Sequence, residues 1–143
     1  MSEQRTIIIG GITGGIGASL ARRLKTGGHN VSGFARDEAR IENLRDELEI
    51  DIAAVDATDP KALENYLESV KESAGRIDAY VHAIGSIFLK PAHLTSPEDW
   101  QDVIHMNLDS AFYALRACTK AMQKQKDGCC LFFSTAAAQV GIA

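Results

Sequence analysis

The chain has 143 residues, a formal net charge of −4 at pH 7, 45% hydrophobic residues and 24% charged residues. This length suits one domain with a sizeable core and is too short for two ordinary domains. The acidic balance argues against a general nucleic-acid binder, and no apolar run approaches the roughly 20 residues that cross a bilayer. No secretory signal is visible, so we expect a cytoplasmic protein without membrane or nucleic-acid partners.

The first informative segment is an apolar strand that passes through glycines into a helix. Residues 7–9 are three isoleucines typical of a buried parallel strand, and five glycines follow within residues 10–17. Glycines allow a tight turn close to a ligand, and a helix N-terminus offers free N–H groups to a phosphate. The segment predicts a dinucleotide site, although a glycine-rich turn without a ligand is the alternative. A P-loop is disfavoured because no Lys-Ser or Lys-Thr pair follows the glycines.

The rest of the chain alternates strands with helices. We expect the first helix to end near Lys25, further strands over residues 30–35, 50–55, 77–83 and 129–133, and helices over residues 37–48, 60–74 and 96–125. Asp37 and Asp59 are expected to cap two of the helices. This alternation predicts an α/β protein: one domain over residues 1–143, with a doubly wound parallel sheet of Rossmann type in the strand order 3-2-1-4-5.

The three cysteines do not indicate a disulfide framework or a zinc site. Cys118 lies on an expected helix, and Cys129 and Cys130 are adjacent on an expected strand. We expect buried thiols in a reducing compartment, with a redox role as the alternative, and no metal site.

The segment from Gly10 to Gly17 resembles the TGxxxGxG fingerprint of the short-chain dehydrogenase/reductase family, with Gly10 at the usual threonine. The resemblance extends over essentially the whole chain. Trp100 and Asn107 resemble the family's pattern on the long helix, and residues 134–141 resemble the segment that carries its catalytic serine. It implies an oxidoreductase that interconverts a carbonyl and an alcohol by hydride transfer with NAD or NADP.

The resemblance also implies a set of cofactor-binding residues. They are Gly11, Thr13, Gly14, Gly15, Ile16, Gly17, Asp56, Ala57, Ala83 and Gly85. Asp56 corresponds to the acid that contacts the adenine amino group, and a capping or turn aspartate is the alternative. Gly85 is expected to let the adenine-side ribose pass close to the backbone.

The residues after the second strand bear on the choice between NADP and NAD. An acid about 20 residues beyond the glycines binds the ribose 2′-hydroxyl of NAD, whereas a nearby arginine accommodates the 2′-phosphate of NADP. Ala35 stands at the usual position of the acid and Arg36 follows it, so we favour NADP. Two alternatives stay open: Asp37 turned toward the ribose, and Arg36 as a solvated surface charge.

The family's catalytic residues are matched in part. Alignment on Val140 and Gly141 puts Thr135 at the position of the catalytic serine, one residue after Ser134. Either hydroxyl could polarise a carbonyl, or both could satisfy backbone groups at a strand end. Asn107 falls at the asparagine that helps to hold a proton-relay water.

Two departures from the family limit this interpretation. The NNAG motif reads His82-Ala83-Ile84-Gly85, and we interpret His82 as a hydrogen-bonded structural residue rather than a catalytic base. The Tyr-x-x-x-Lys pair is missing, because residues Val70, Ile84 and Ala117 stand four positions after the three tyrosines. We therefore expect the cofactor-binding part of the family's fold, without its last two strands and inactive alone. Oligomers are common in the family, so the resemblance also implies a homo-oligomer when the protein is intact.

Two other functions compete with this one. A dinucleotide-binding module or regulator would need no tyrosine–lysine pair. A methyltransferase that uses S-adenosylmethionine also has glycines after its first strand, but the helix pattern at Trp100 and Asn107 favours the dehydrogenase family. The substrate, beyond a small carbonyl or alcohol, is not identified by these residues.

Overall fold

The computed structural model describes residues 3–136 and 139. Its sheet has five parallel strands in the order β3-β2-β1-β4-β5, which confirms the predicted class and order. The strands are β1 (Thr6–Gly10), β2 (Asn30–Ala35), β3 (Asp51–Ala54), β4 (Ala79–His82) and β5 (Cys129–Phe132). In the register, Gly10 at the end of β1 lies between Phe34 of β2 and His82 of β4. The carboxyl ends of the central strands therefore meet at one edge of the sheet.

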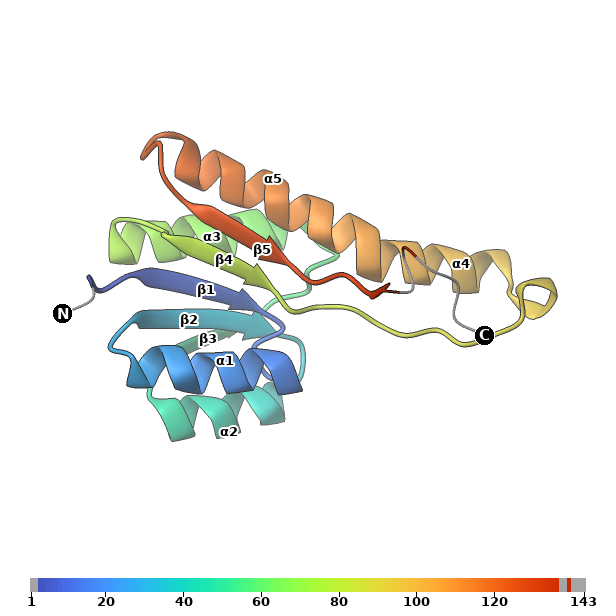
Figure 1. The fold of residues 1–143 in the computed structure, drawn as a ribbon, viewed down its shortest axis with the longest axis horizontal. Helices are drawn as coiled ribbons and strands as arrows, with labels where there is room; N and C mark the ends of the chain where they lie inside the picture. The colour runs from blue at the N-terminus through green and yellow to red at the C-terminus, as the bar shows by residue number, and fades with distance from the viewer. Residues whose placement is uncertain (1–2, 137–138, 140–143) are drawn as a thin grey trace.

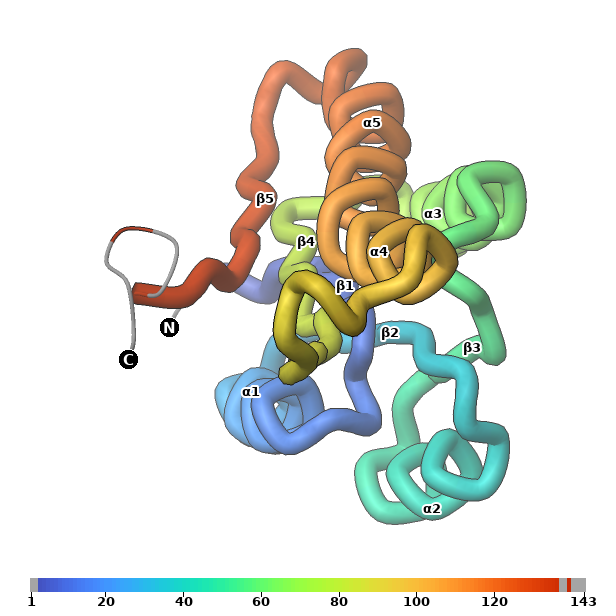
Figure 2. Tube along the Cα trace, turned by 90° about the vertical axis from the view of Figure 1, so that its right-hand side faces the viewer, coloured from blue at the N-terminus to red at the C-terminus, as the bar shows by residue number. Residues whose placement is uncertain are grey.

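Helices cover both faces of this sheet. They are α1 (Gly15–Thr26), α2 (Glu38–Leu48), α3 (Pro60–Ala74), α4 (Pro97–Ile104) and α5 (Ser110–Gln123), with a short 3-10 turn η1 (Ala92–Leu94) and a π-helical turn η2 (His105–Asp109). Figure 1 shows α1 and α2 on one face and α3 and α5 on the other. Figure 2, seen from the side toward which the strands run, shows the same two layers, with α4 and the loop that precedes it toward the viewer.

The two layers enclose two hydrophobic cores, and β1 contributes to both. Ile8 packs with residues of α3 and α5, whereas Ile7 and Ile9 pack with residues of α1 and α2. This division follows from the alternation of side chains along a strand. It explains why a strand buried on both faces is apolar throughout.

The predicted helix caps at Asp37 and Asp59 are confirmed. The Asp37 carboxylate accepts a hydrogen bond from the backbone N–H of Arg40 at 3.1 Å. The Asp59 carboxylate accepts from Lys61 and Ala62 at 2.9 and 3.0 Å. Each cap satisfies N–H groups that the first turn of a helix leaves without a partner.

The single long helix expected over residues 96–125 is wrong in its middle. The π turn η2 separates α4 from α5, and the Ser110 N–H donates to the His105 carbonyl five residues earlier. The expected start of strand four is also wrong, since β4 begins at Ala79. The Ile77 carbonyl accepts instead from the Gln125 side chain at 2.6 Å.

The expected burial of all three thiols is wrong for Cys129. Cys118 is buried in α5 and Cys130 is partly buried on β5, but Cys129 is exposed. Neighbouring residues of a strand point to opposite faces, and Leu131, on the same face as Cys129, is 46% exposed. The face of β5 that carries Cys129 is therefore open to solvent.

Candidate functional site

The glycine turn between β1 and α1 depends on two of its five glycines. Gly11 has φ +75°, and a Cβ there would lie 2.6 Å from the Ala83 carbonyl oxygen. A Cβ on Gly17 would lie 2.8 Å from the Cα of Ile12, so this glycine lets α1 pack against the strand end. Gly15, by contrast, has open space around it. The chain thus needs glycine at positions 11 and 17 for the turn itself.

The start of α1 is open to a ligand. Gly14 is its N-cap and makes no side-chain cap hydrogen bond, and the first turn contains no acidic residue. An uncapped helix N-terminus presents N–H groups and a partial positive charge. The site is therefore suited to an anion such as a pyrophosphate.

A cleft of about 360 Å³ lies beside this turn at the carboxyl ends of β1, β2 and β4. It brings together eight of the predicted cofactor residues: Gly11, Thr13, Gly14, Arg36, Asp56, Ala57, Ala83 and Gly85. Gly15 and Gly17 lie in the first turn of α1 and do not line it, and Ile16 lines a neighbouring pocket.

Arg36 and Asp37 have different surroundings at the mouth of this cleft. Asp37 caps α2 and also pairs with Arg40 at 3.3 Å, so its carboxylate is engaged by its own helix. Within the described residues, the exposed Arg36 guanidinium forms no ion pair within 4.0 Å. Arg36 is thus the available cation of the cleft. Arg40, which also lines it, was missed by the sequence analysis and is one helical turn beyond Asp37.

Asp56 also lines the cleft, in a turn after β3. Its carboxylate accepts from the backbone N–H and the hydroxyl of Thr58 at 2.9 and 2.8 Å. The Thr58 N–H lowers the pKa of Asp56, and the nearby charges of Arg36 and His105 act in the same direction. The aspartate is therefore a turn residue that also lines the cleft.

A second pocket, of about 780 Å³, shares the wall formed by residues Ala83, Ile84 and Gly85. It brings together the three residues predicted for catalysis, Asn107, Ser134 and Thr135. Asn107 Oδ1 accepts from the Ser86 N–H at 2.9 Å, and Asn107 Nδ2 donates to the Ser86 hydroxyl at 3.1 Å. Val140 and Gly141, on which the alignment of Thr135 depended, lie outside the described residues.

His82 is buried at the end of β4, with 4% of its surface exposed. Its Nδ1 lies 2.9 Å from the Tyr80 hydroxyl and its Nε2 lies 3.2 Å from the Ser110 hydroxyl. Burial lowers the pKa of His82 to about 4, so the ring is neutral at neutral pH. The interpretation of His82 as a hydrogen-bonded structural residue is confirmed.

The part of the chain that the structure describes has neither a metal-binding cluster nor a membrane-spanning helix. No group of three or more His, Cys, Asp or Glu side chains is arranged to hold a metal ion. None of the helices is long and apolar enough to span a membrane.

Comparison with known proteins decides the family. A family model described as short chain dehydrogenase matches residues 5–143. The chain belongs to the short-chain dehydrogenase family. Among solved structures, serine dehydrogenase from Escherichia coli superposes with a TM-score of 0.88 at 30% identity, over 96% of this chain and 65% of that one.

Two curated members of the short-chain dehydrogenase family are similar to this chain, at identities close to that of the serine dehydrogenase. The NADP-dependent 3-hydroxy acid dehydrogenase YdfG of Escherichia coli K12 is 32% identical over 125 residues, which are 85% of this chain and 50% of the relative. The 3-oxoacyl-(acyl-carrier-protein) reductase FabG of Salmonella typhimurium LT2 is 29% identical over 128 residues, 88% and 52% of the two chains. The chain thus spans about half the length of the curated relatives it matches.

Proposed function

We propose that this chain binds NADP(H) in the 360 Å³ cleft and forms the cofactor end of an oxidoreductase that interconverts a carbonyl and an alcohol. The observation that carries the choice of cofactor is the contrast between Arg36 and Asp37. The guanidinium is available at the mouth of the cleft, whereas the carboxylate that would bind a 2′-hydroxyl is engaged by Arg40. The printed name of YdfG, an NADP-dependent dehydrogenase, agrees with this choice.

The residues of the cleft fit the parts of a dinucleotide. The uncapped start of α1 would hold the pyrophosphate, Arg36 would hold the 2′-phosphate through its forked donors, and Asp56 would accept from the adenine amino group. Gly11 and Gly85 line a wall of the cleft along which a ligand could approach the backbone. A side chain at position 11 would meet the Ala83 carbonyl, so this wall depends on glycine.

The second pocket supplies the groups that act on the substrate. When bound, the nicotinamide supplies or accepts the hydride. The hydroxyl of Thr135 or Ser134 donates a hydrogen bond to the carbonyl oxygen, where negative charge develops. Asn107 holds Ser86 and the loop after β4 in place beside these hydroxyls.

The test is a pair of binding titrations on the Arg36→Ala variant, followed by nicotinamide fluorescence. We expect NADPH to bind roughly 10–100-fold more weakly, since a charge-assisted hydrogen bond is worth about 1.5–3 kcal/mol, and NADH to bind almost as before. Arg23→Ala is the matched control, because Arg23 is an exposed arginine of α1 outside the cleft. Equal losses for NADPH and NADH would overturn the choice of NADP.

A dinucleotide-binding module without catalysis is the second candidate, and the engagement of Tyr66 and Tyr80 within the fold is consistent with it. The Tyr66 hydroxyl donates to the Gly33 carbonyl at 2.9 Å, and Tyr80 contacts His82. Burial raises the pKa of both tyrosines, so neither of these two is suited to donate a proton to a substrate. NADPH oxidation by this chain in the presence of 3-oxo acids would overturn this candidate.

The homo-oligomer and the cytoplasmic location stay predictions. Several large apolar side chains on one stretch of helix suit contact with a second copy: Trp100 on α4, Leu108 on η2 and Phe112 and Leu115 on α5 are each at least 44% exposed. Sedimentation of the purified protein would test the oligomer.

A further inference from the structure

Two departures from the family pattern, at positions 10 and 82, belong to one buried arrangement. The Tyr80 hydroxyl contacts His82 Nδ1, and it lies where a Cβ on Gly10 would be only 2.5 Å away. A threonine at position 10 would therefore displace the tyrosine hydroxyl. Glycine at the end of β1 makes room for the partner that His82 requires.

The hydrogen bonds of this arrangement have only one consistent direction. The Ser110 hydroxyl has a single proton and donates it to the Met106 carbonyl at 2.5 Å, so it accepts from His82 Nε2–H at 3.2 Å. His82 Nδ1 then carries no proton and accepts from the Tyr80 hydroxyl. The chain of donors runs from Tyr80 through His82 and Ser110 to the Met106 carbonyl. All three side chains in it are buried.

This series of hydrogen bonds ends at the Met106 carbonyl, which the π turn leaves without its usual backbone donor, the Ser110 N–H. In a regular α-helix the Ser110 N–H would donate to Met106, four residues earlier. In η2 it donates to His105 instead, and the Ser110 hydroxyl takes its place at the Met106 carbonyl. Met106 is partly buried, and the loss of a hydrogen bond costs about 0.5–1.5 kcal/mol, so the hydroxyl stabilises the π turn over the α-helical register.

The π turn in turn determines where Asn107 points. Asn107 lies within η2, and its side chain donates to Ser86 Oγ and to the Val103 carbonyl at 3.1 and 3.0 Å. Return to an α-helical register would rotate it about the helix axis relative to Ser86. The second pocket would then lose the contact between α4–η2 and the loop after β4.

We propose that Ser110 and His82 are positioning residues that hold the π turn in the register that directs Asn107 at Ser86. Only the consequence for catalysis rests on the proposed function. The register and the Asn107 contact can be measured without a cofactor or a substrate.

The experiment is amide hydrogen exchange and NMR on Ser110→Ala. We expect backbone amides of residues 107–110 to exchange roughly tenfold faster and the Asn107 side-chain amide signals to shift, while β1 and β4 amides change less than about threefold. Ser110→Thr, which keeps the hydroxyl, restores the signals. Thr119→Ala is the matched control, because the Thr119 hydroxyl donates to the carbonyl four residues earlier in regular α-helix, at 2.8 Å.

Uniformly faster exchange across the sheet, or unchanged Asn107 signals, would overturn the proposal. The tautomer of His82 gives a second test in the unaltered protein, in case Ser110→Ala does not fold. Ring nitrogen shifts must show the Nε2–H form, and the Nδ1–H form would contradict the direction of the chain. Absence of NADPH and NADH binding by the unaltered protein, together with a shifted Asn107 signal in Ser110→Ala, would reject the proposed function and leave the positioning role intact.

Discussion

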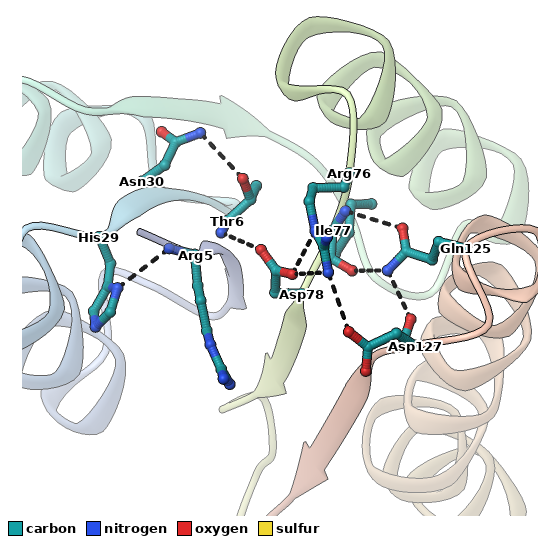
Figure 3. A network of polar contacts seen from close by, with 9 residues as sticks. All are labelled: Arg5, Thr6, His29, Asn30, Arg76, Ile77, Asp78, Gln125 and Asp127. Carbon is teal, nitrogen blue, oxygen red and sulfur yellow. Dashed lines mark hydrogen bonds and ion pairs between the residues drawn. The ribbon is translucent and has the colours of Figure 1, made fainter. Parts of the chain in front are cut away.

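The two ends of the sheet are built differently. Where the strands start, the polar groups pair with one another (Figure 3). Asp78 accepts hydrogen bonds from the Thr6 N–H at 2.7 Å and from Arg76 at 2.6 Å, and Arg76 also pairs with Asp127 at 3.1 Å. The Gln125 side-chain amide donates to the carbonyls of Ile77 and Asp127. Where the strands end, the backbone turns through glycines, α1 begins without a side-chain cap, and Arg36 forms no ion pair within the described residues. At the strand starts the hydrogen-bond donors are paired within the protein, whereas at the strand ends donors are available to a ligand.

A hollow alone does not distinguish the two edges. A pocket of about 260 Å³ also lies where the strands start, lined by Lys25 and Glu49 among others. There the Lys25 ammonium donates to the Glu49 carbonyl at 3.3 Å, and both charge signs line the walls. The difference lies in the available donors, so substitutions at the two edges should separate binding from stability.

The largest expected effect is at Gly11, where the turn itself would be lost. Gly11→Ala combines a left-handed φ of +75° with a Cβ 2.6 Å from the Ala83 carbonyl oxygen. We expect roughly 2–5 kcal/mol lower free energy of unfolding, together with loss of NADPH binding. Gly15→Ala is the control: a Cβ there has open space, so stability should stay within about 1 kcal/mol of the original. Equal losses in urea denaturation would contradict the assignment of the turn to Gly11.

A smaller effect is expected at the opposite edge. Asp78→Ala leaves the Thr6 N–H and Arg76 without the carboxylate, whose side chain is only 10% exposed. We expect the free energy of unfolding to fall by roughly 2–4 kcal/mol, while NADPH affinity of the folded fraction is unchanged. Asp127→Ala removes the exposed partner of the same arginine and should cost below about 1 kcal/mol. Weaker NADPH binding in folded Asp78→Ala would show that the two edges are coupled.

The sequence predicted correctly those parts of the fold that depend on interactions between residues close together in the chain. The capping aspartates Asp37 and Asp59, the alternation of strands and helices, and the glycine turn all depend on residues a few positions apart. Right-handed crossovers then restrict the topology of a parallel sheet to a few strand orders, of which the predicted order is one. The same proximity in sequence explains why Arg36 was recognised, since it follows β2 directly.

The features that were missed depend on contacts between distant residues. The π turn is stabilised through Ser110 by His82, which is 28 residues away, and periodicity in residues 96–125 carries no sign of it. Arg40 reaches the cleft only because α2 begins beside it, and Cys129 is exposed because nothing described covers its face of β5. These are tertiary effects that override local preference.

The smallest expected effect concerns His82, in the uncharged series of hydrogen bonds at the strand ends, and contrasts it with the charged network at the strand starts. The pKa of His82 is lowered to about 4 by burial, against about 6.5 in an unfolded chain, so the unfolded state binds a proton first as the pH falls. The contribution of His82 is therefore complete above pH 6.5 and is lost toward pH 4. Between pH 7.5 and 5 we expect it to lower the free energy of unfolding by about 2 kcal/mol. His82→Asn removes this group, and the difference between the two pH profiles from chemical denaturation isolates it from the other histidines. Parallel profiles would mean that His82 is protonated as readily in the folded protein as in the unfolded chain, which would contradict its burial and its directed contacts with Tyr80 and Ser110.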